Sequence, residues 1–418
     1  MKLVFLHPTG NANVRAAASG LARSNLLYRF HTGIACFTGS LLDRLSYIPL
    51  FSEIRRRNFD IALQSFTKTA PWLELGRLIA SKFGMTKLLK HEVGPLSIDA
   101  VYKNLDKQVA LSLKEAHTNG VKAVYAYEDG AAFSFMEGKR LGLQCLYDLP
   151  TGYWRASREL LQKEQERRPE WSMTFTGFLD SETKLAQKDE ELRLADRIFV
   201  ASEFTADTLK YYPGKLKPVS VIPYGFPEVG KIKEYSLISD RRPLKLLYVG
   251  KLTQQKGIAD LFSAIDDLGK KVSLTIVGQK ANNDCPALNA KLSEHEWIPT
   301  LPHDAVIKIM REHDVLVFPS LFDGFGLVIS EAMAQGTPVI TTERTAGPSL
   351  IKHGVNGWLV KAGSTRELQA TIEHLLKFPE QIELSGRQAM ETAKSRPWSV
   401  YSQELNEAIV KHLSNIVD

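Results

Sequence analysis

The chain has 418 residues and a formal net charge of +6, and hydrophobic and charged residues make up 44% and 24% of it. This composition is ordinary for a soluble globular protein, and the length exceeds one ordinary core, so we expect two domains of about 200 residues each. No run reaches the ~20 apolar residues that a membrane-spanning helix needs, and the first residues are too briefly apolar for a secretory signal.

The positive charge is concentrated in the first part of the chain. Residues 1–120 hold 16 Lys and Arg against 8 Asp and Glu. Such a surface can attract an anionic membrane or an anionic acceptor, or it can be a solvated basic face. The basic residues are not interleaved with a recognisable RNA- or DNA-binding module, so nucleic acid is not an expected partner.

The cysteines and histidines give no sign of a metal or redox site. Cys36, Cys145 and Cys285 are widely spaced without a CxxC pair, and the ten histidines form no H-x3-H or HExxH arrangement. We interpret the thiols as reduced core residues, which indicates a cytoplasmic protein. A cytoplasmic protein with this basic surface can also contact the inner face of the membrane peripherally. We expect His7 and His303 to be structural or surface residues, and we expect no metal or cofactor.

In the first half, apolar runs predict strands separated by helices. The predicted strands are Leu3–His7, Ile61–Phe66, Val121–Tyr127, Cys145–Tyr147, Ile198–Ala201 and Val219–Ile222. The predicted helices are Arg15–Phe30, Phe133–Leu141 and Trp154–Arg167. Residues 67–120 contain amphipathic pieces and many lysines, and we interpret them as an insertion that carries acceptor contacts.

The second half alternates more clearly. The predicted strands are Leu244–Val249, Val272–Val277, Val315–Phe318, Thr337–Thr341 and Gly357–Val360. The predicted helices are Ile258–Leu268, Ala287–Glu294, Asp304–Glu312, Leu327–Gln335 and Arg366–Lys377. Alternating strands and helices indicate a parallel sheet with crossover helices.

The fold class predicted is therefore α/β, with two doubly wound Rossmann-like domains that face a cleft. Domain boundaries follow from a polar segment rich in Pro and Gly near residues 223–243. We expect a first domain over 1–225, a linker over 226–243 and a second domain over 244–395. Residues 396–418 are predicted to form a helix, from Trp398 to Ile416, that packs back toward the first domain.

A lysine loop follows the first strand of the second half. Gly250 to Gly257 contains Lys251 and Lys256, and a helix is predicted to start near Gly257. The loop lacks the order of a Walker A motif. Lysines at the carboxyl end of a parallel strand are nevertheless well placed to bind phosphate, although a solvated surface loop has the same composition.

A second loop, Asp323-Gly-Phe-Gly326, precedes the helix that is predicted from Leu327. Glycines let the backbone approach a ligand, and the amino end of a helix favours phosphate. Asp323 can accept hydrogen bonds from sugar hydroxyls, and Glu331, one turn into the helix, can hold a ribose diol. Helix capping by Asp323 and a solvated helix face at Glu331 are the alternatives.

Polar residues at the predicted strand ends of the first half can also face the cleft. His7 to Ala12 is a strand-to-helix turn that contains Gly10. Five residues that follow later strands or begin a helix are candidates for binding the molecule that accepts a transferred group: Glu128, Asp129, Asp148, Trp154 and Arg155. Helix capping is the alternative for Asp129 and Asp148.

Together these residues resemble the retaining nucleotide-sugar glycosyltransferases of the family-four type (glycosyl transferases group 1), which have the GT-B fold. The resemblance is strongest over residues 244–377, and the family's phosphate loop and E-x7-E element are matched by Gly250, Lys251, Lys256 and Asp323 to Glu331. Three further segments of this stretch also resemble the family, namely Ala332–Val339, Ala346–Pro348 and Gly354–Val360. In the first half the resemblance is thinner and covers Ala195–Ser202 and Val221–Gly225. The resemblance implies an acceptor-binding domain over 1–225 and a nucleotide-sugar-binding domain over 244–395.

The resemblance implies a role for each matched residue. Lys251 and Lys256 would bind the donor diphosphate, Asp323 the donor sugar and Glu331 the ribose, and these four would carry the catalysis. Donor binding would also involve the loop backbones, Gly10 and the segment that frames the base: Gly10, Gly250, Trp297, Pro299, Leu301, Gly324, Phe325, Gly326 and Leu327.

Two residues depart from the family pattern. Asp323 stands where the family mostly has Glu, and Lys251 stands where Arg is common, so the bidentate fork of an arginine is lost. Both changes keep the charge and can alter donor choice, geometry or activity.

The resemblance implies retaining transfer of a sugar from a nucleotide-diphosphate-sugar to a glycan, lipid-linked or small-molecule acceptor, in surface polysaccharide or glycoconjugate biosynthesis. The alternatives are a GT-B sugar-nucleotide epimerase or phosphorylase, and a non-catalytic nucleotide-sugar-binding protein. The sequence leaves open the donor base and sugar, the acceptor and the linkage.

Overall fold

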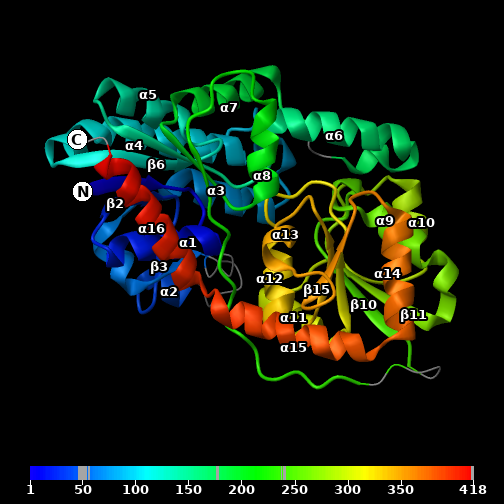
Figure 1. Cartoon of the computed structure of the whole chain (residues 1–418). Coiled ribbons are helices and arrows are strands. Elements are labelled where there is room, and N and C mark those ends of the chain that lie inside the picture. Colours follow the sequence, from blue (N-terminus) through cyan, green and yellow to red (C-terminus); the bar gives the residue numbers. More distant parts are fainter. Residues whose placement is uncertain (46–53, 55–56, 176–177, 237, 239–241, 416–418) are drawn as a thin grey trace.

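The computed structural model describes residues 1–418 apart from 46–53, 55–56, 176–177, 237, 239–241 and 416–418. Two parallel sheets lie side by side, each covered by helices (Figure 1). Parts of the expected linker, residues 237 and 239–241, and the last residue of the expected C-terminal helix, 416, lie outside the described residues. Within the described chain, every helix is too short or too polar to span a lipid bilayer.

The N-terminal sheet has the order β5-β2-β1-β6-β7-β8-β9, and all its pairs are parallel. Its strands are β1 (Lys2–Leu6), β2 (Leu27–Thr32), β5 (Thr67–Thr69), β6 (Val121–Tyr127), β7 (Gln144–Leu149), β8 (Arg197–Val200) and β9 (Val219–Val221). Two short strands, β3 (Cys36–Phe37) and β4 (Asn58–Phe59), pair separately. The helices of this half are α1 (Ala12–Arg23), α2 (Leu41–Leu45), α3 (Pro71–Lys82), α4 (Ile98–Thr118), α5 (Ala132–Arg140), α6 (Trp154–Arg167), α7 (Glu182–Leu194) and α8 (Glu203–Thr208).

The C-terminal sheet has the order β12-β11-β10-β13-β14-β15 and is also parallel. Its strands are β10 (Leu244–Val249), β11 (Val272–Val277), β12 (Glu296–Ile298), β13 (Val315–Phe318), β14 (Val339–Thr342) and β15 (Gly357–Val360). The helices in this part of the chain are α9 (Ile258–Ile265), α10 (Pro286–Leu292), α11 (His303–Glu312), α12 (Leu327–Ala334), α13 (Gly347–Leu350), α14 (Thr365–Lys377) and α15 (Glu380–Ser395), and α16 (Trp398–Ser414) follows them. Short 3₁₀ helices are Ile61–Phe66, Thr86–Leu89, Pro169–Thr174, Leu209–Tyr211, Gln254–Lys256 and Asp266–Lys271.

Both sheets are doubly wound, which confirms the predicted fold class. Strand order reverses between β1 and β6 in one sheet and between β10 and β13 in the other. Central strands such as Val315–Phe318 are buried at every residue, as expected for strands covered on both faces. Ligands of such sheets bind beyond the carboxyl ends of the strands at the point of reversal. The topology therefore marks the ends of β1, β6, β10 and β13 as the place to look for a site.

Two predictions for the first half were wrong. The helix expected over Arg15–Phe30 ends at Arg23, because Asn25 turns the chain with a positive φ of 56° and Leu27 starts strand β2. The segment Ile61–Phe66, expected to be a strand, is a 3₁₀ helix whose Asp60 cap accepts a hydrogen bond from the Ala62 amide at 3.0 Å. In both places local turn chemistry overrides the apolar pattern.

The chain crosses between the two halves at two adjacent points. Phe226 forms an isolated bridge with Pro397, and its amide donates to the Arg396 carbonyl at 2.9 Å. After the second crossing, α16 packs along α1, as Figure 1 shows for the red and blue helices. The fit is close, since a Cβ at Gly20 would lie 2.5 Å from the Ser402 Cβ. The last helix thus belongs to the core of the N-terminal half.

A buried ion pair joins the halves a second time. Asp260, at the start of α9, is 2% exposed and accepts bonds from Arg167 at 2.7 Å and Thr365 at 2.7 Å. Gln254 donates to the same carboxylate at 3.0 Å. Asn in place of this carboxylate would weaken its charge-assisted hydrogen bonds, although Arg167 is 37% exposed and also pairs with Glu164 at 2.7 Å.

We therefore expect Asp260→Asn to lower the free energy of unfolding by about 3 kcal/mol in urea denaturation. The matched control is Asp207→Asn, because among the described residues the exposed Asp207 pairs with the exposed Lys210 alone, at 2.5 Å. That change should have little effect on stability, because an ion pair between exposed side chains contributes little. Equal effects of the two substitutions would contradict a structural role for the Asp260 pair.

Candidate functional site

Both points of strand reversal open onto one cavity of ≈ 410 Å³ between the two halves. The first half contributes His7, Asn11, Asn13, Tyr102, Tyr127, Pro150 and Tyr224. The second half contributes Val249, Gly250, Lys256, Phe318, Asp323, Phe325, Gly326, Leu327 and Val328. The carboxyl ends of β1, β6, β10 and β13 all reach it, so the topology and the cavity point to the same place.

The lysine loop is braced by the loop that follows β13. Gly257 has a φ of +71°, and a Cβ there would lie 2.0 Å from the Pro319 carbonyl oxygen, so this position requires glycine. The Gln255 carbonyl accepts a hydrogen bond from the Leu321 amide at 2.9 Å. Lys256 reaches the cavity, whereas Lys251 is an exposed residue outside its lining. Desolvation lowers the pKa of the Lys251 ammonium.

Lys256 and Asp323 form an ion pair inside the cavity, with Nζ and Oδ2 2.5 Å apart. The other carboxylate oxygen of Asp323 accepts from the Phe325 amide at 3.2 Å, which fixes the turn into α12. The N-cap position of α12 is Gly326, with a φ of +82° and no side-chain cap. An uncapped helix amino end next to an ammonium group is a favourable place for an anion.

Gly324 ties this loop to the N-terminal half. Its carbonyl accepts bonds from the buried hydroxyls of Ser202, at 2.6 Å, and Thr205, at 3.1 Å. A Cβ at Gly324 would lie 2.1 Å from the Pro150 carbonyl oxygen. The Asp323 loop is therefore positioned by contacts from both halves.

Glu331 lies next to the cavity without lining it. It is one helical turn beyond Leu327 and Val328, and its Oε1 is 4.0 Å from Nδ1 of His303. Burial raises the pKa of the Glu331 carboxyl, and the charge of His303 opposes this shift. His303 begins α11, directly after the segment from Trp297 to Pro302. Glu331 and that segment thus approach each other at one side of the site.

Trp297 occupies a fixed position at the edge of the C-terminal sheet. Its indole Nε1 donates to the Gly278 carbonyl at 2.9 Å, and the Lys280 ammonium lies 4.5 Å from the ring centroid. Gly278 touches the lysine loop, since a Cβ there would lie 1.8 Å from the Gly250 carbonyl oxygen. Pro299 and Leu301 follow in the connection to α11. None of these three predicted donor residues lines the cavity among the residues described.

In the first half, the structure brings other residues to the cavity than those predicted. Gly10 packs on Phe59, whose ring would be 2.6 Å from a Cβ at Gly10, and its neighbour Asn11 lines the cavity instead. His7, expected to be structural or a surface residue, is buried and lines the cavity. Burial and the charge of Arg57 lower the pKa of His7 to about 4, against an opposing contact with the Thr9 backbone.

The five acceptor candidates lie outside the cavity lining described here, each held by neighbours within the N-terminal half. Glu128 accepts from the Thr151 hydroxyl at 3.1 Å and lies 3.5 Å from Lys188, which is also 3.5 Å from Asp129. Asp148 is 3% exposed and accepts from the Tyr125 hydroxyl at 2.6 Å.

Trp154 and Arg155, at the start of α6, share one partner. The Trp154 indole donates to Asp189 at 2.8 Å, and the Arg155 guanidinium donates to it at 2.6 Å. Arg155 also stacks on Trp154, 4.1 Å from its ring centroid. The pair is thus engaged in a local cluster, and the role predicted for it in acceptor binding stays a prediction.

One group of potential metal ligands comes together in the described chain, at His91, Glu92 and Asp180. Its charges already have partners, since Lys184 lies 3.5 Å from Asp180 and Ser181 donates to Glu92. The group does not line the cavity.

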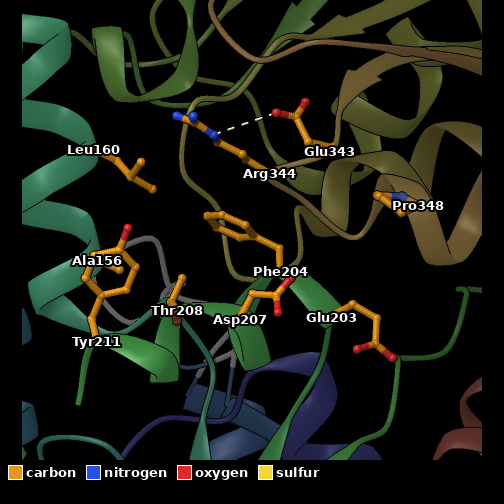
Figure 2. Close-up of a pocket in the computed structure, with 10 residues that line it drawn as sticks. All are labelled: Ala156, Leu160, Glu203, Phe204, Asp207, Thr208, Tyr211, Glu343, Arg344 and Pro348. Atoms are coloured by element: carbon orange, nitrogen blue, oxygen red, sulfur yellow. Dashed lines mark ion pairs between the residues drawn. The ribbon is translucent and has the colours of Figure 1, made fainter. Parts of the chain in front are cut away.

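A second cavity of ≈ 430 Å³ lies between α6 and α8 on one side and the loop after β14 on the other (Figure 2). In Figure 2 the ion pair of Glu343 and Arg344, 3.7 Å apart, faces Phe204 across the opening. Phe204 packs against Phe322 with ring centroids 5.2 Å apart, and Phe322 precedes Asp323. None of the residues predicted to bind donor or acceptor lines this cavity.

Residues 232–392 match the family model described as glycosyl transferases group 1, which confirms the resemblance over that stretch. The amylovoran biosynthesis glycosyltransferase AmsK of Erwinia amylovora is 29% identical over 147 residues, 32% of this chain and 36% of that protein. The chain spans less than half of the length of the first curated relatives that it matches.

Solved structures resemble the whole chain. Sucrose-phosphate synthase from Thermosynechococcus elongatus has a TM-score of 0.65 and 18% identity over 99% of this chain and 100% of that one. HepE of Anabaena in complex with UDP-glucose has a TM-score of 0.61 and 17% identity over 98% and 100%. The fold is accordingly GT-B.

We predict that Gly324→Ala forces the two halves apart at Pro150, because the new Cβ meets backbone that cannot move alone. Small-angle X-ray scattering should show a larger radius of gyration, and the melting temperature should fall. Gly142→Asn is the control, since Gly142 has a φ of +73° with open space around it and Asn tolerates that conformation. An unchanged radius in Gly324→Ala would rule out the proposed packing.

Asp148 predicts a pH dependence of stability. Burial raises its pKa from 3.8 to about 7, against the hydrogen bond from Tyr125, so the folded state holds a proton that the unfolded chain releases. This contribution is present below about pH 4 and is lost as the pH rises to about 7. In urea denaturation, the stability difference between wild type and Asp148→Asn should fall by roughly 4 kcal/mol over that range. A difference that stays constant with pH would contradict the assignment.

Proposed function

We propose that this protein is a retaining glycosyltransferase that moves a sugar from a nucleotide-diphosphate-sugar to a glycan, lipid-linked or small-molecule acceptor. The observation that carries the proposal is the cleft cavity, in which Lys256, Asp323 and the amino end of α12 lie together. The match over residues 232–392 and the fold shared with a UDP-glucose complex support a nucleotide-sugar ligand. Biosynthesis of a surface polysaccharide or glycoconjugate is the setting we propose.

The arrangement suggests which residues would bind each part of the donor. The diphosphate would lie against Lys256 and the first turn of α12, where positive charge is already oriented. Asp323 and the Gly324–Leu327 backbone would hold the sugar. Glu331 would take the ribose, and the segment from Trp297 to Pro302 would frame the base, with Lys251 at the exposed rim of the loop.

The reaction we propose breaks the bond between the anomeric carbon and the diphosphate oxygen, and the acceptor oxygen bonds to the same face of that carbon. The acceptor proton passes to the departing phosphate oxygen, so no enzymic nucleophile is needed. Lys256 and the α12 amino end would stabilise the charge of the leaving diphosphate. Among the described residues that line the cavity, Asp323 is the one carboxylate and is paired with Lys256, so the proposal uses no metal ion.

Two alternatives use the same cavity. An epimerase or phosphorylase would also bind the donor diphosphate there, and a non-catalytic sensor would bind it without turnover. The close pairing of Lys256 with Asp323 favours the sensor slightly, because each group partly neutralises the other. The acceptor and peripheral membrane contact are further parts of the proposal, and the membrane contact is developed below.

Donor binding is expected to raise the melting temperature, because a ligand that binds only the folded state stabilises it. A thermal-shift screen of UDP, GDP, ADP and their sugars should identify the base. With the donor found, Lys256→Ala and Glu331→Ala should each lower turnover by roughly 10²-fold, or about 3 kcal/mol for a lost charged partner. Lys245→Ala, at the exposed opposite end of β10, is the matched control and should keep full turnover.

Full turnover in both site variants would overturn the proposal. Donor incubated without acceptor distinguishes the alternatives, since epimerised or phosphorolysed sugar would identify the other enzyme classes. Tight binding with no product across a broad acceptor panel would identify a sensor. The anomeric configuration of the product, measured by NMR, decides between retention and inversion.

A further inference from the structure

A row of large apolar side chains faces solvent along α3 and the segment that follows it. Trp72 is 83% exposed and Phe83, at the end of the helix, is 64% exposed, with Ile79 between them. Their spacing of seven and four residues places all three on one face of the helix. Residues 81–88 are all exposed and include Met85 and Leu88. We call residues 72–90 the amphiphilic ridge.

The ridge is attached to the fold by its opposite face. Leu75 and Leu78 pack against a small buried cluster. Glu74 is fully buried and paired with Arg57, at 2.6 Å, and Arg77, at 2.7 Å. Helix α3 therefore has its own inner packing face, and its outer apolar row is not needed to hold it in place. A row of large apolar groups on the outer face of an attached helix marks an interaction surface.

The charge around this row has one sign. Residues 61–90 contain five basic side chains and a single acidic one, Glu74, which is buried under two arginines. The basic residues are Lys68, Arg77, Lys82, Lys87 and Lys90. Exposed Trp and Phe beside lysines is the composition of a segment that lies in the interface of an anionic bilayer.

We propose that the amphiphilic ridge docks on an anionic lipid surface, with Trp72, Phe83 and Met85 entering the headgroup region and the lysines contacting lipid phosphates. A symmetric contact between two copies through this surface would bring their lysines face to face, which disfavours a second copy as the occupant. A protein partner would have to supply both an apolar pocket for Trp72 and Phe83 and acidic groups for the lysines.

The ridge adjoins the cleft. Glu74 packs against Gly33, 3.3 Å from where a Cβ would be, and the Gly33 amide donates to the Pro8 carbonyl at 3.0 Å, one residue beyond His7. Helix α4 follows the ridge and supplies Tyr102 to the cavity. Docking would thus bring the N-terminal side of the cleft close to the bilayer. This part rests on the proposed function, because it selects a lipid-linked acceptor among the three acceptor classes.

The test is sedimentation of the full chain, without donor, with vesicles of phosphatidylcholine alone or mixed with phosphatidylglycerol. Binding is expected to the mixed vesicles and to weaken with salt. Trp72→Ala with Phe83→Ala, and separately Lys82→Glu with Lys87→Glu, should each lower the partition coefficient about tenfold or more. The controls are Leu384→Ala and Lys308→Glu, two exposed residues of the C-terminal half that should leave binding unchanged.

A second measurement locates the contact. Acyl chains that carry bromine should quench part of the tryptophan fluorescence, and Trp72→Phe should remove that quenching while vesicles still bind. Absence of vesicle binding at low salt, or equal loss in ridge and control variants, would overturn the proposal. Thermal shifts with nucleotide sugars, measured on the same variants, keep this outcome separate from failure of the proposed function, because the ridge residues do not line the donor cavity.

Discussion

The contact of Gly324 with the N-terminal half is the constraint on which the candidate site depends. The loop that carries Asp323 leaves the C-terminal sheet, yet its Gly324 carbonyl is held by Ser202 and Thr205 and its Cα is packed on Pro150. A side chain at this position would separate two sheets that are otherwise joined by the crossings at Phe226 and Pro397. The loop that carries the carboxylate is thus held by both halves, whereas the carboxylate itself is held by Lys256 and the Phe325 amide of the C-terminal half.

The electrostatics of the cleft follow from the same arrangement. Lys256 and Asp323 neutralise each other at 2.5 Å, and the uncapped amino end of α12 adds partial positive charge beside them. Opposite this pair, burial keeps His7 neutral, so the first half contributes hydrogen-bonding groups to the cavity without charge. Among the described residues that line the cavity, the charged ones, Lys256 and Asp323, therefore both come from the C-terminal half.

Much of the C-terminal half could be predicted from its sequence, because strands buried on both faces are continuous apolar runs, as at Leu244–Val249 and Val315–Phe318. Lys256 and Asp323 were found because strand ends of such sheets share one edge. The first half was less predictable, since Leu27–Thr32 continues the apolar pattern of α1 and becomes a strand through pairing with β1 and β5. Tyr102 reaches the cavity from a helix that no local signal marked, and Tyr224 reaches it from Val221–Gly225, a segment that resembles the family but to which no role was assigned.

Helix α16 completes the core of the N-terminal half although it lies near the other end of the chain. Tyr401, Leu405 and Ile409 are buried in the same core as Leu21 and Phe30, which lie almost four hundred residues earlier in the chain. During synthesis the ribosome makes the N-terminal sheet long before the helix that completes its core. That half must therefore wait with an uncovered apolar face along α1 until the C-terminal sheet has been made, which is the period when a nascent chain of this kind most needs chaperones.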